Sequence, residues 1–333
     1  MLQYTARRVI GAIPLVLAIT IVVFFVVRLI PGDPVTAMLP AEATLEDIER
    51  MRALYGLDEP IIVQFWLWLV QLFQLNLGES LMYHEPVIDV LVRRFPATLE
   101  LASFAAIIGF IVGITLGTVA AIHQNKWPDR LASVVGLLGI SAPTFWIGLM
   151  LIIYVAVPTG LFPTGGRMAP GASPGGPTGM NLIDTLLAGD VGGFLQALNY
   201  ILLPAVTLGL ATTGLLVRMT RASMLEVLGD DYIRTARAKG ARPRAIYFRH
   251  GFRNASRPIA TVFGLEVADL LAGSIVIETI FAWPGVGSTL IEAVNSRDYP
   301  LVQGTVLMYA LIFVICNLGV DIAYRLIDPR ITY

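Results

Sequence analysis

Two acidic residues, Glu266 and Asp269, stand within residues 259–282, one of the most apolar stretches of the chain. On a helix they are three positions apart, so their carboxylates share a face, which Gly273 continues. A charge in hydrocarbon costs at least about 2.5–3.5 kcal/mol, so this face is expected to meet a cavity or another helix. In a cavity the carboxylates would attract an amine or a metal cation, and against a helix they would be hydrogen-bonded to it. Our working hypothesis is that Glu266 and Asp269 line a substrate path.

The other reactive side chains form no catalytic or metal-binding pattern. The three histidines are scattered along the chain, and the single cysteine, Cys316, allows no disulfide within one chain. Ser103 and Ser141 have no histidine at membrane depth, which argues against an intramembrane serine protease. No segment reads Gly-x-x-x-x-Gly-Lys-Ser/Thr, so the chain has no phosphate-binding loop of its own. We therefore expect no enzyme activity and no cofactor bound by this chain.

A basic segment, residues 223–258, lies between two apolar stretches and contains a predicted short helix. Asp230 and Asp231 mark the start of this helix and Gly240 marks its end, because acids favour a helix N-terminus and glycine favours the position just past a C-terminus. The predicted helix covers residues 231–239. At helical spacing Tyr232, Ala236 and Lys239 share one face, and Arg234 and Arg237 share another.

A second helix is expected after the turn, because Pro243 suits a first helical turn. It would run to about Ser256, before Pro258 opens the next apolar helix. One interpretation of the arginines here is that they only fix topology beside anionic lipid. The capped helix and its glycine turn instead favour a rigid lever that transmits force to a cytoplasmic partner.

The composition requires much of the chain to lie in a membrane. Of its 333 residues 56% are hydrophobic and only 14% are charged, against about 25% charged in soluble domains. A helix needs about 20 apolar residues to cross roughly 30 Å of hydrocarbon. The stretches that approach this length are residues 9–27, 101–122, 131–157, 200–217, 259–282 and 301–320. We expect an all-α integral membrane protein with six transmembrane helices, kinked near Pro14, Pro143 and Pro204.

The basic residues indicate which way these helices point. With the N-terminus inside, sixteen of the 23 Lys and Arg residues fall on the cytoplasmic side, so both termini are expected there. Two long extracytoplasmic insertions result, residues 31–96 and 158–199. In the first, residues 44–54 predict a short amphipathic helix, and residues 61–77, with two tryptophans, an interfacial helix. The second is rich in proline and glycine, so its irregular backbone must lie in water or against protein.

Many short motifs resemble those of one family. Tyr232–Gly240 and Arg249–Ala255 resemble its version of the EAA loop. The other motifs are Arg28–Pro34, Tyr55–Pro60, Leu77–Ser80, Pro96–Glu100, Ser141–Trp146, Glu278–Gly285, Arg297–Pro300 and Asp328–Arg330. The family is that of the permease subunits of binding-protein-dependent ABC importers of the dipeptide/oligopeptide/nickel class, and the chain is most similar to the B-type subunit. One departure is that Arg234–Ala236 stands where the broader consensus has Glu-Ala-Ala.

The resemblance implies the fold and the coupling residues. The fold would be the type I ABC importer transmembrane domain: residues 1–94 as the first helix with an extracytoplasmic segment, 95–326 as five helices with the coupling loop 223–258, and 327–333 as a cytoplasmic tail. In that family the loop docks in a cleft of the ATP-binding subunit. Carried over, the docking residues are Tyr232, Ala236, Arg237, Lys239 and Gly240. Glu278, near the outer end of its span, is expected to anchor the turn that follows.

The resemblance also implies partners and location. The chain would pair with a second, homologous permease, two cytoplasmic ATP-binding subunits that use ATP and Mg²⁺, and an extracytoplasmic substrate-binding protein. It would lie among lipids in a prokaryotic inner membrane and bind no nucleic acid. The expected function is to form half of a translocation path for short peptides, with nickel chelates, glutathione and oligosaccharides as alternatives. A secondary transporter working alone would predict inverted repeats, and no convincing repeat is present.

Overall fold

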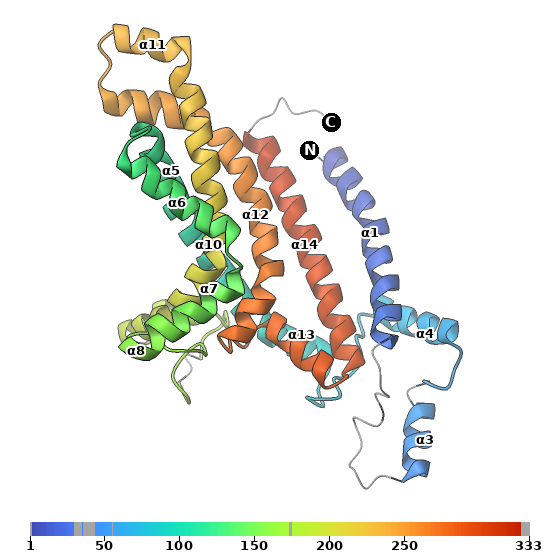
Figure 1. The fold of residues 1–333 in the computed structure, drawn as a ribbon. Coiled ribbons are helices and arrows are strands. Elements are labelled where there is room, and N and C mark those ends of the chain that lie inside the picture. The colour runs from blue at the N-terminus through green and yellow to red at the C-terminus, as the bar shows by residue number, and fades with distance from the viewer. Residues whose placement is uncertain (1, 30–34, 36–43, 55, 173–174, 328–333) are drawn as a thin grey trace. The chain divides into compact units, whose positions relative to one another are not determined.

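The computed structural model describes residues 2–29, 35, 44–54, 56–172 and 175–327. These residues form helices and connecting segments, with no strand beyond a single bridge between Glu79 and Pro86 (Figure 1). The helices are α1 (Leu2–Arg28), α3 (Leu45–Leu54), α4 (Ile61–Phe73), α5 (Val87–Ile122), α6 (Trp127–Ser141), α7 (Thr144–Leu151), η1 (Ile152–Ala156), α8 (Val157–Thr159), α9 (Asn181–Leu187), α10 (Val191–Gly229), α11 (Asp231–Ala238), η2 (Ala245–Phe252), α12 (Arg253–Ile280), α13 (Val286–Asn295) and α14 (Tyr299–Ile327). The all-α prediction is confirmed for this part of the chain. The motif residues 30–34 and the expected tail beyond Ile327 lie outside it.

The contacts divide the chain into two compact units. Unit 1 contains Met1–Ala97 and Pro284–Ile315, and unit 2 contains Thr98–Trp283 and Cys316–Tyr333. Each unit therefore joins an early part of the chain to a late one. The helices α5 and α14 are continuous across a unit boundary, since residues 97 and 315 lie inside them.

Four of the six predicted spans are helices long and apolar enough to cross a membrane: α5, α10, the continuous helix Ala245–Ile280, and Tyr299–Gly319 of α14. The pair formed by α6 and Thr144–Thr159 would be a fifth if it counts as one span. The first predicted span is the 27-residue helix α1, of which Ile13–Arg28 is the apolar part among the described residues. The count of six and the orientation stay predictions.

The third predicted span, residues 131–157, is not one straight helix. It bends by 109° between Ser141 and Thr144. Pro143 has no N–H to donate and forces the preceding Ala142 out of the helical region, to φ −85° and ψ 134°. The predicted kink at Pro143 is thus present as a complete break. A π-helical stretch, η1, interrupts the second arm.

The expectation that Pro258 opens a new helix is wrong. Residues 245–280 form one continuous helix, with Pro258 inside α12 and a π-helical stretch, η2, as its first two turns. A proline inside a helix removes one hydrogen bond, whereas ending the helix there would leave up to four carbonyls without partners. Continuity is therefore the less costly arrangement.

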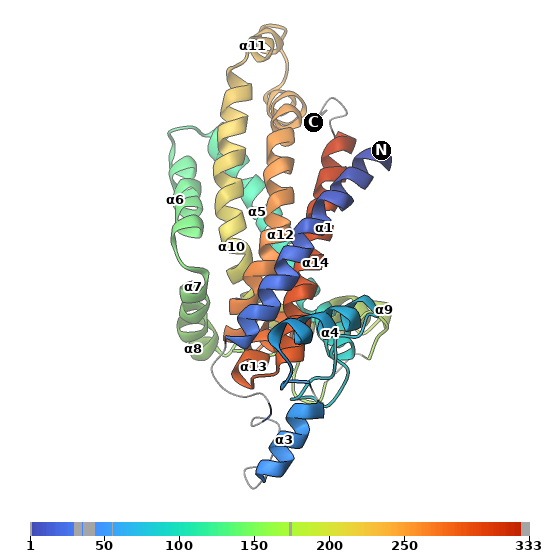
Figure 2. The same cartoon turned by 90° about the vertical axis from the view of Figure 1, so that its right-hand side faces the viewer.

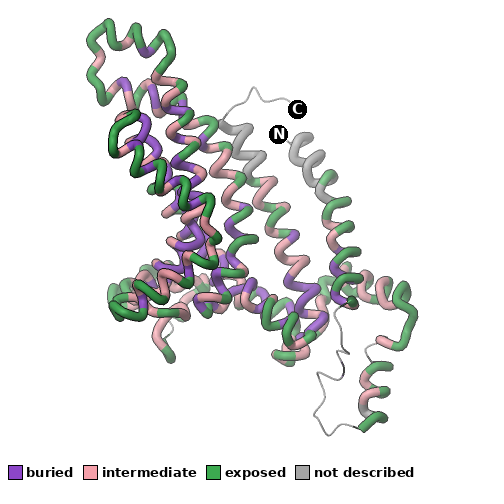
Figure 3. Tube along the Cα trace, viewed as in Figure 1, coloured by how far each residue is buried: buried purple, intermediate pink, exposed green. Residues whose placement is uncertain are grey.

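Helix α10 is the hub of unit 2 and is largely buried (Figure 3). It packs against α6, α7, α9 and α12, and glycines bring two neighbours to backbone distance. A Cβ at Gly113 of α5 would lie 2.6 Å from the Leu216 Cβ, and one at Gly139 of α6 would lie 2.4 Å from the Leu210 carbonyl oxygen. Small residues permit such close approach between helices in membranes.

The core of unit 1 joins the end of α1 to α5, α13 and α14. Val27, Leu91, Val286 and Leu301 are all nearly fully buried members of this cluster. The amphipathic helix predicted at 44–54 is confirmed as α3, and a helix is present within residues 61–77 as α4. Its location at the membrane interface stays a prediction. With 13 residues α4 is too short to span a membrane.

Candidate functional site

The helix predicted at residues 231–239 is confirmed as α11, which lies at one end of unit 2, with α8 at the other (Figures 1 and 2). One apolar side chain, Ile233, holds it, with no exposed surface. Gly240 ends the helix at φ +76°, and its N–H donates to the Arg237 carbonyl at 2.9 Å. Nothing lies within 4 Å of a Cβ built there, so backbone conformation alone requires glycine.

The five predicted docking residues all lie on or just beyond α11. Tyr232, Arg237, Lys239 and Gly240 are exposed, and Ala236 is half-buried. Tyr232 also contacts its own chain: the Asn254 side-chain amide donates to its hydroxyl at 2.7 Å. That bond closes the loop, because it ties the first turn of α11 to the first turn of α12.

The departure from the EAA consensus leaves an arginine at the surface. Arg234 pairs with Asp231 at 3.3 Å, with 75% and 94% of the two side chains exposed. An exposed ion pair of this kind contributes little to the stability of the fold, typically about 0–1 kcal/mol. Arg234 is therefore available to a partner where the consensus would present a carboxylate.

The second arm of the loop is fixed to α10. Gly251 of η2 is buried, and a Cβ there would lie 3.2 Å from the Leu228 side chain. Its neighbours Phe248 and Arg249 are exposed. The second arm of the loop is therefore packed against α10 on one side. On its other side it exposes basic and aromatic side chains.

The two acids of the fifth span have different surroundings. The Thr212 hydroxyl of α10 donates to the Glu266 carboxylate at 3.2 Å, and Glu266 is half-buried. Asp269 is exposed on α12, and Gly273 on the same face is also exposed. The hydrogen-bonded alternative thus describes Glu266, and the open face holds Asp269.

A buried ion pair that the sequence did not predict holds the proline- and glycine-rich segment. Arg167 pairs with Glu100 of α5, with 15% and 3% of the side chains exposed. Glu100 also accepts from the Leu182 N–H at 2.7 Å, and the Arg167 guanidinium lies 5.4 Å from the centre of the Trp283 ring. The irregular backbone is therefore attached to protein at Arg167 and Leu182, which is one of the two expected alternatives. The signal in the sequence was the pair of motifs Pro96–Glu100 and Glu278–Gly285, which this cluster joins.

Glu278 belongs to the same end of unit 2 and is fully buried. Its carboxylate accepts from the Thr98 hydroxyl at 2.7 Å, while its backbone carbonyl accepts from the Trp283 N–H at 2.8 Å. Its backbone carbonyl anchors the following turn, as expected. Its side chain joins α12 to α5.

A second unpredicted ion pair lies toward the α11 end. Asp129 at the start of α6 accepts two hydrogen bonds from Arg221 of α10, at 2.6 and 2.9 Å, and one from the Asn125 N–H at 2.8 Å. Asp129 is 4% exposed. Bidentate pairing of this kind fixes orientation as well as distance, so α6 and α10 are joined close to the loop.

Within the described ranges, no group of three or more His, Cys, Asp or Glu side chains could hold a metal ion. The candidate site consists of the exposed short helix α11 at one end of unit 2 and an acidic face on α12.

The comparison with known proteins identifies the family. Residues 113–333 match the family of binding-protein-dependent transport system inner membrane components, and residues 1–102 match the N-terminal family of the same components. The chain is 40% identical, over the whole of both chains, to a dipeptide transport system permease of Alkalihalophilus pseudofirmus. It is 43% identical to a di/tripeptide transport system permease of Pseudomonas aeruginosa, over 100% of this chain and 99% of the relative. It is 37% identical, again over both full lengths, to a glutathione transport system permease of Escherichia coli. The chain belongs to the family of inner membrane permease components of binding-protein-dependent ABC transport systems, and is a multi-pass inner membrane protein.

Proposed function

We propose that this chain forms one half of the translocation path of an ATP-driven importer of short peptides. The observation that carries the proposal is α11, an exposed short helix held by Ile233 and ended by a left-handed Gly240. The names of the relatives support di- and tripeptides as substrates, and glutathione is itself a short peptide. Nickel chelates and oligosaccharides remain alternatives within the same importer class.

The working complex would contain this chain, a homologous second permease, two cytoplasmic ATP-binding subunits and an extracytoplasmic binding protein. In it the six spans and the coupling loop 223–258 adopt the N-inside orientation. ATP and Mg²⁺ would be bound by the partner subunits, and their closure would move α11 of each permease. Because Tyr232 and Gly251 tie the loop to α12 and α10, a displacement of α11 would reach both spans. This is a two-state element biased by a ligand.

The direct test is uptake of a radiolabelled dipeptide by proteoliposomes that contain the assembled transporter. Uptake should require ATP and Mg²⁺ on the side of the membrane that corresponds to the cytoplasm. It should also require the binding protein on the opposite side. Purification of this chain without any ATP-binding subunit, together with uptake by the chain alone, would contradict the proposal and favour a secondary transporter.

Coupling should fail when Gly240 is replaced by proline. The ring fixes φ near about −65° and removes the N–H, whereas Gly240 has φ +76° and donates to Arg237. We expect uptake to fall at least about tenfold, since 1.4 kcal/mol of strain already changes a population tenfold. Gly240→Asn should retain more activity, because asparagine tolerates this conformation. Gly229→Ala, a site with nothing within 4 Å of the added methyl, is the control. Full uptake by Gly240→Pro would refute the role of the turn.

The acidic face is tested by the double change Glu266→Gln with Asp269→Asn. If these carboxylates face the path, uptake and transport-coupled ATPase activity should both fall, by roughly tenfold for loss of a charge-assisted contact to a peptide amine. Glu46→Gln, on the exposed face of α3, is a matched control for loss of an acid. Unchanged uptake and ATPase activity in the double variant would contradict the path hypothesis. The role of Glu266 would then be limited to its hydrogen bond with Thr212.

A further inference from the structure

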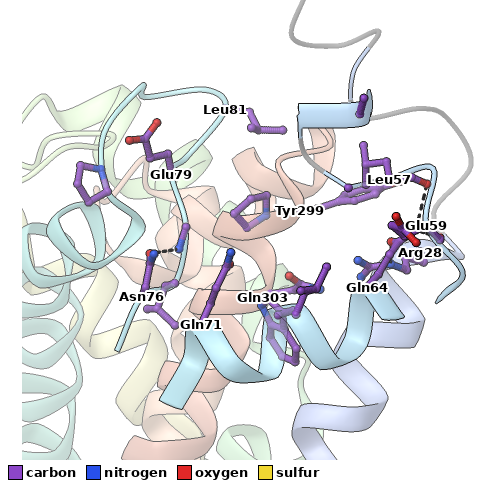
Figure 4. Close-up of a pocket in the computed structure, with 18 residues that line it drawn as sticks. Arg28, Leu57, Glu59, Gln64, Gln71, Asn76, Glu79, Leu81, Tyr299 and Gln303 are labelled. Atoms are coloured by element: carbon purple, nitrogen blue, oxygen red, sulfur yellow. Dashed lines mark hydrogen bonds between the residues drawn. The ribbon is translucent and has the colours of Figure 1, made fainter. Parts of the chain in front are cut away.

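Unit 1 contains a pocket of about 730 Å³ that the proposed function does not use (Figure 4). Its walls come from the end of α1, from α4 and the turn before it, from the segment between α4 and α5, and from the first turns of α14. Pockets for small molecules typically have about 300–1,000 Å³. In the predicted orientation the pocket opens on the extracytoplasmic side.

One wall holds a buried donor without a partner. Gln303 of α14 is 4% exposed and lines the pocket, and its side-chain Nε2 has no hydrogen-bond partner among the described residues. A buried amide left unpaired costs about 1–3 kcal/mol. The cost disappears if a ligand supplies an acceptor.

Beside it lies an arginine that forms no ion pair with a described acid, although Glu59 also lines the pocket and lies on the Arg28 side in Figure 4. Arg28 donates through Nε to the Gln64 side chain at 3.0 Å and through Nη1 to the Phe24 carbonyl at 3.2 Å. Its guanidinium lies 3.5 Å from the centre of the Phe24 ring. Within the described part of the chain no acidic side chain pairs with it. A fixed guanidinium with unused N–H groups suits a carboxylate.

An acid stands at the other side of the pocket. Glu79 is exposed, lines the pocket, and forms no ion pair with any described residue. Figure 4 shows Arg28 and Glu79 on opposite sides, with Tyr299 and Gln303 between them. Apolar side chains, among them Leu67 and Trp68, complete the walls. Opposite charges across a half-apolar pocket match a molecule with a carboxylate at one end and an ammonium at the other.

We propose that this pocket is a second binding site for zwitterionic di- and tripeptides, separate from the translocation path. Arg28 and Gln303 hold the C-terminal carboxylate, and Glu79 holds the N-terminal ammonium. The choice of ligand rests on the proposed function, whereas the arrangement of charges does not. Such a site would retain a peptide close to the permease after its release from the binding protein.

The test is equilibrium dialysis of radiolabelled alanylalanine against the detergent-solubilised transporter, without binding protein or ATP, in the Glu266→Gln, Asp269→Asn background. Arg28→Gln should weaken binding about tenfold to a hundredfold, the usual range for a hydrogen bond to a charged group. Alanylalanine amide should bind the unaltered pocket equally weakly, and Arg28→Gln should weaken it no further. Gln303→Leu should weaken peptide binding without lowering stability, because its amide is already unpaired. The control is Arg93→Gln, because Arg93 pairs with Glu85 and neither residue lines the pocket.

Absence of binding, or binding unaffected by Arg28→Gln and by amidation, would overturn the proposal. So would variants that weaken association of the binding protein but leave peptide affinity unchanged, since the pocket would then receive a protein side chain. If peptides bind here but are not imported, the proposed function fails and the site stands. If peptides are imported but do not bind here, only this site fails.

Discussion

Replacing Glu100 by alanine should destabilise unit 2 by about 3–5 kcal/mol, the usual result of removing one partner of a buried ion pair. The change leaves the Arg167 guanidinium, 15% exposed, without its carboxylate, and it leaves the Leu182 N–H without its acceptor. Because both partners lie in the segment after α8, that segment should detach first. The measurement is the thermal midpoint of the purified transporter, together with the rate of proteolysis at Arg167.

The control for this change is Glu85→Ala. Glu85 also pairs with an arginine, Arg93 at 2.9 Å, but 41% and 54% of these side chains are exposed. Exposed pairs contribute about 0–1 kcal/mol, so the thermal midpoint should barely move. The double change Glu100→Leu with Arg167→Met should recover much of the loss, since it leaves no unpaired buried charge. An equal fall in the thermal midpoint for Glu100→Ala and Glu85→Ala would show that the buried pair stabilises the protein no more than the exposed one.

A single methyl group on Gly139 should also destabilise the protein. A Cβ there would lie 2.4 Å from the Leu210 carbonyl oxygen and 3.2 Å from the Gly214 Cα, so α6 must move away from α10. Because the obstacle is backbone, no side-chain rotation relieves it. We expect Gly139→Ala to cost about 1–3 kcal/mol, as overpacking does, and to lower the thermal midpoint and the yield of assembled transporter.

The matched control is Gly273→Ala, in the middle of α12. There the added Cβ would meet only the Leu208 side chain, at an ordinary 3.7 Å. Both changes gain the same helix propensity, about 1 kcal/mol, so their difference reports packing alone. A midpoint for Gly139→Ala at or above that for Gly273→Ala would contradict the close approach of α6 to α10.

The features that sequence predicted well are those set by neighbouring residues. The boundaries of α11 follow from Asp231 and Gly240, which act within one turn of the backbone. The amphipathic α3 and the short α4 follow in the same way from local spacing. The position of the break in the third span also follows from one residue, Pro143, because it lacks an N–H.

Features that depend on tertiary packing were not predictable from one chain. The 109° bend at Pro143 requires α7 to pack against both α10 and α12, with Gly148 close to Phe281. The ion pairs Glu100–Arg167 and Asp129–Arg221 join residues 67 and 92 positions apart. Nothing in the spacing of these charges distinguishes them from charges that only fix topology. The same holds for Thr212, which reaches Glu266 from another helix.

The division into units has a consequence for biosynthesis. The fully buried Asp298 accepts hydrogen bonds from Ser80, 218 residues earlier, at 2.6 Å, and from the Leu301 N–H at 3.0 Å. At about 5–20 residues per second, a ribosome adds Asp298 roughly 10–40 s after Ser80. Unit 1, although it contains the N-terminus, therefore cannot be completed until residues 284–315, near the end of the chain, have been synthesised. Its early segments must wait in the membrane for the ribosome to finish α13 and begin α14.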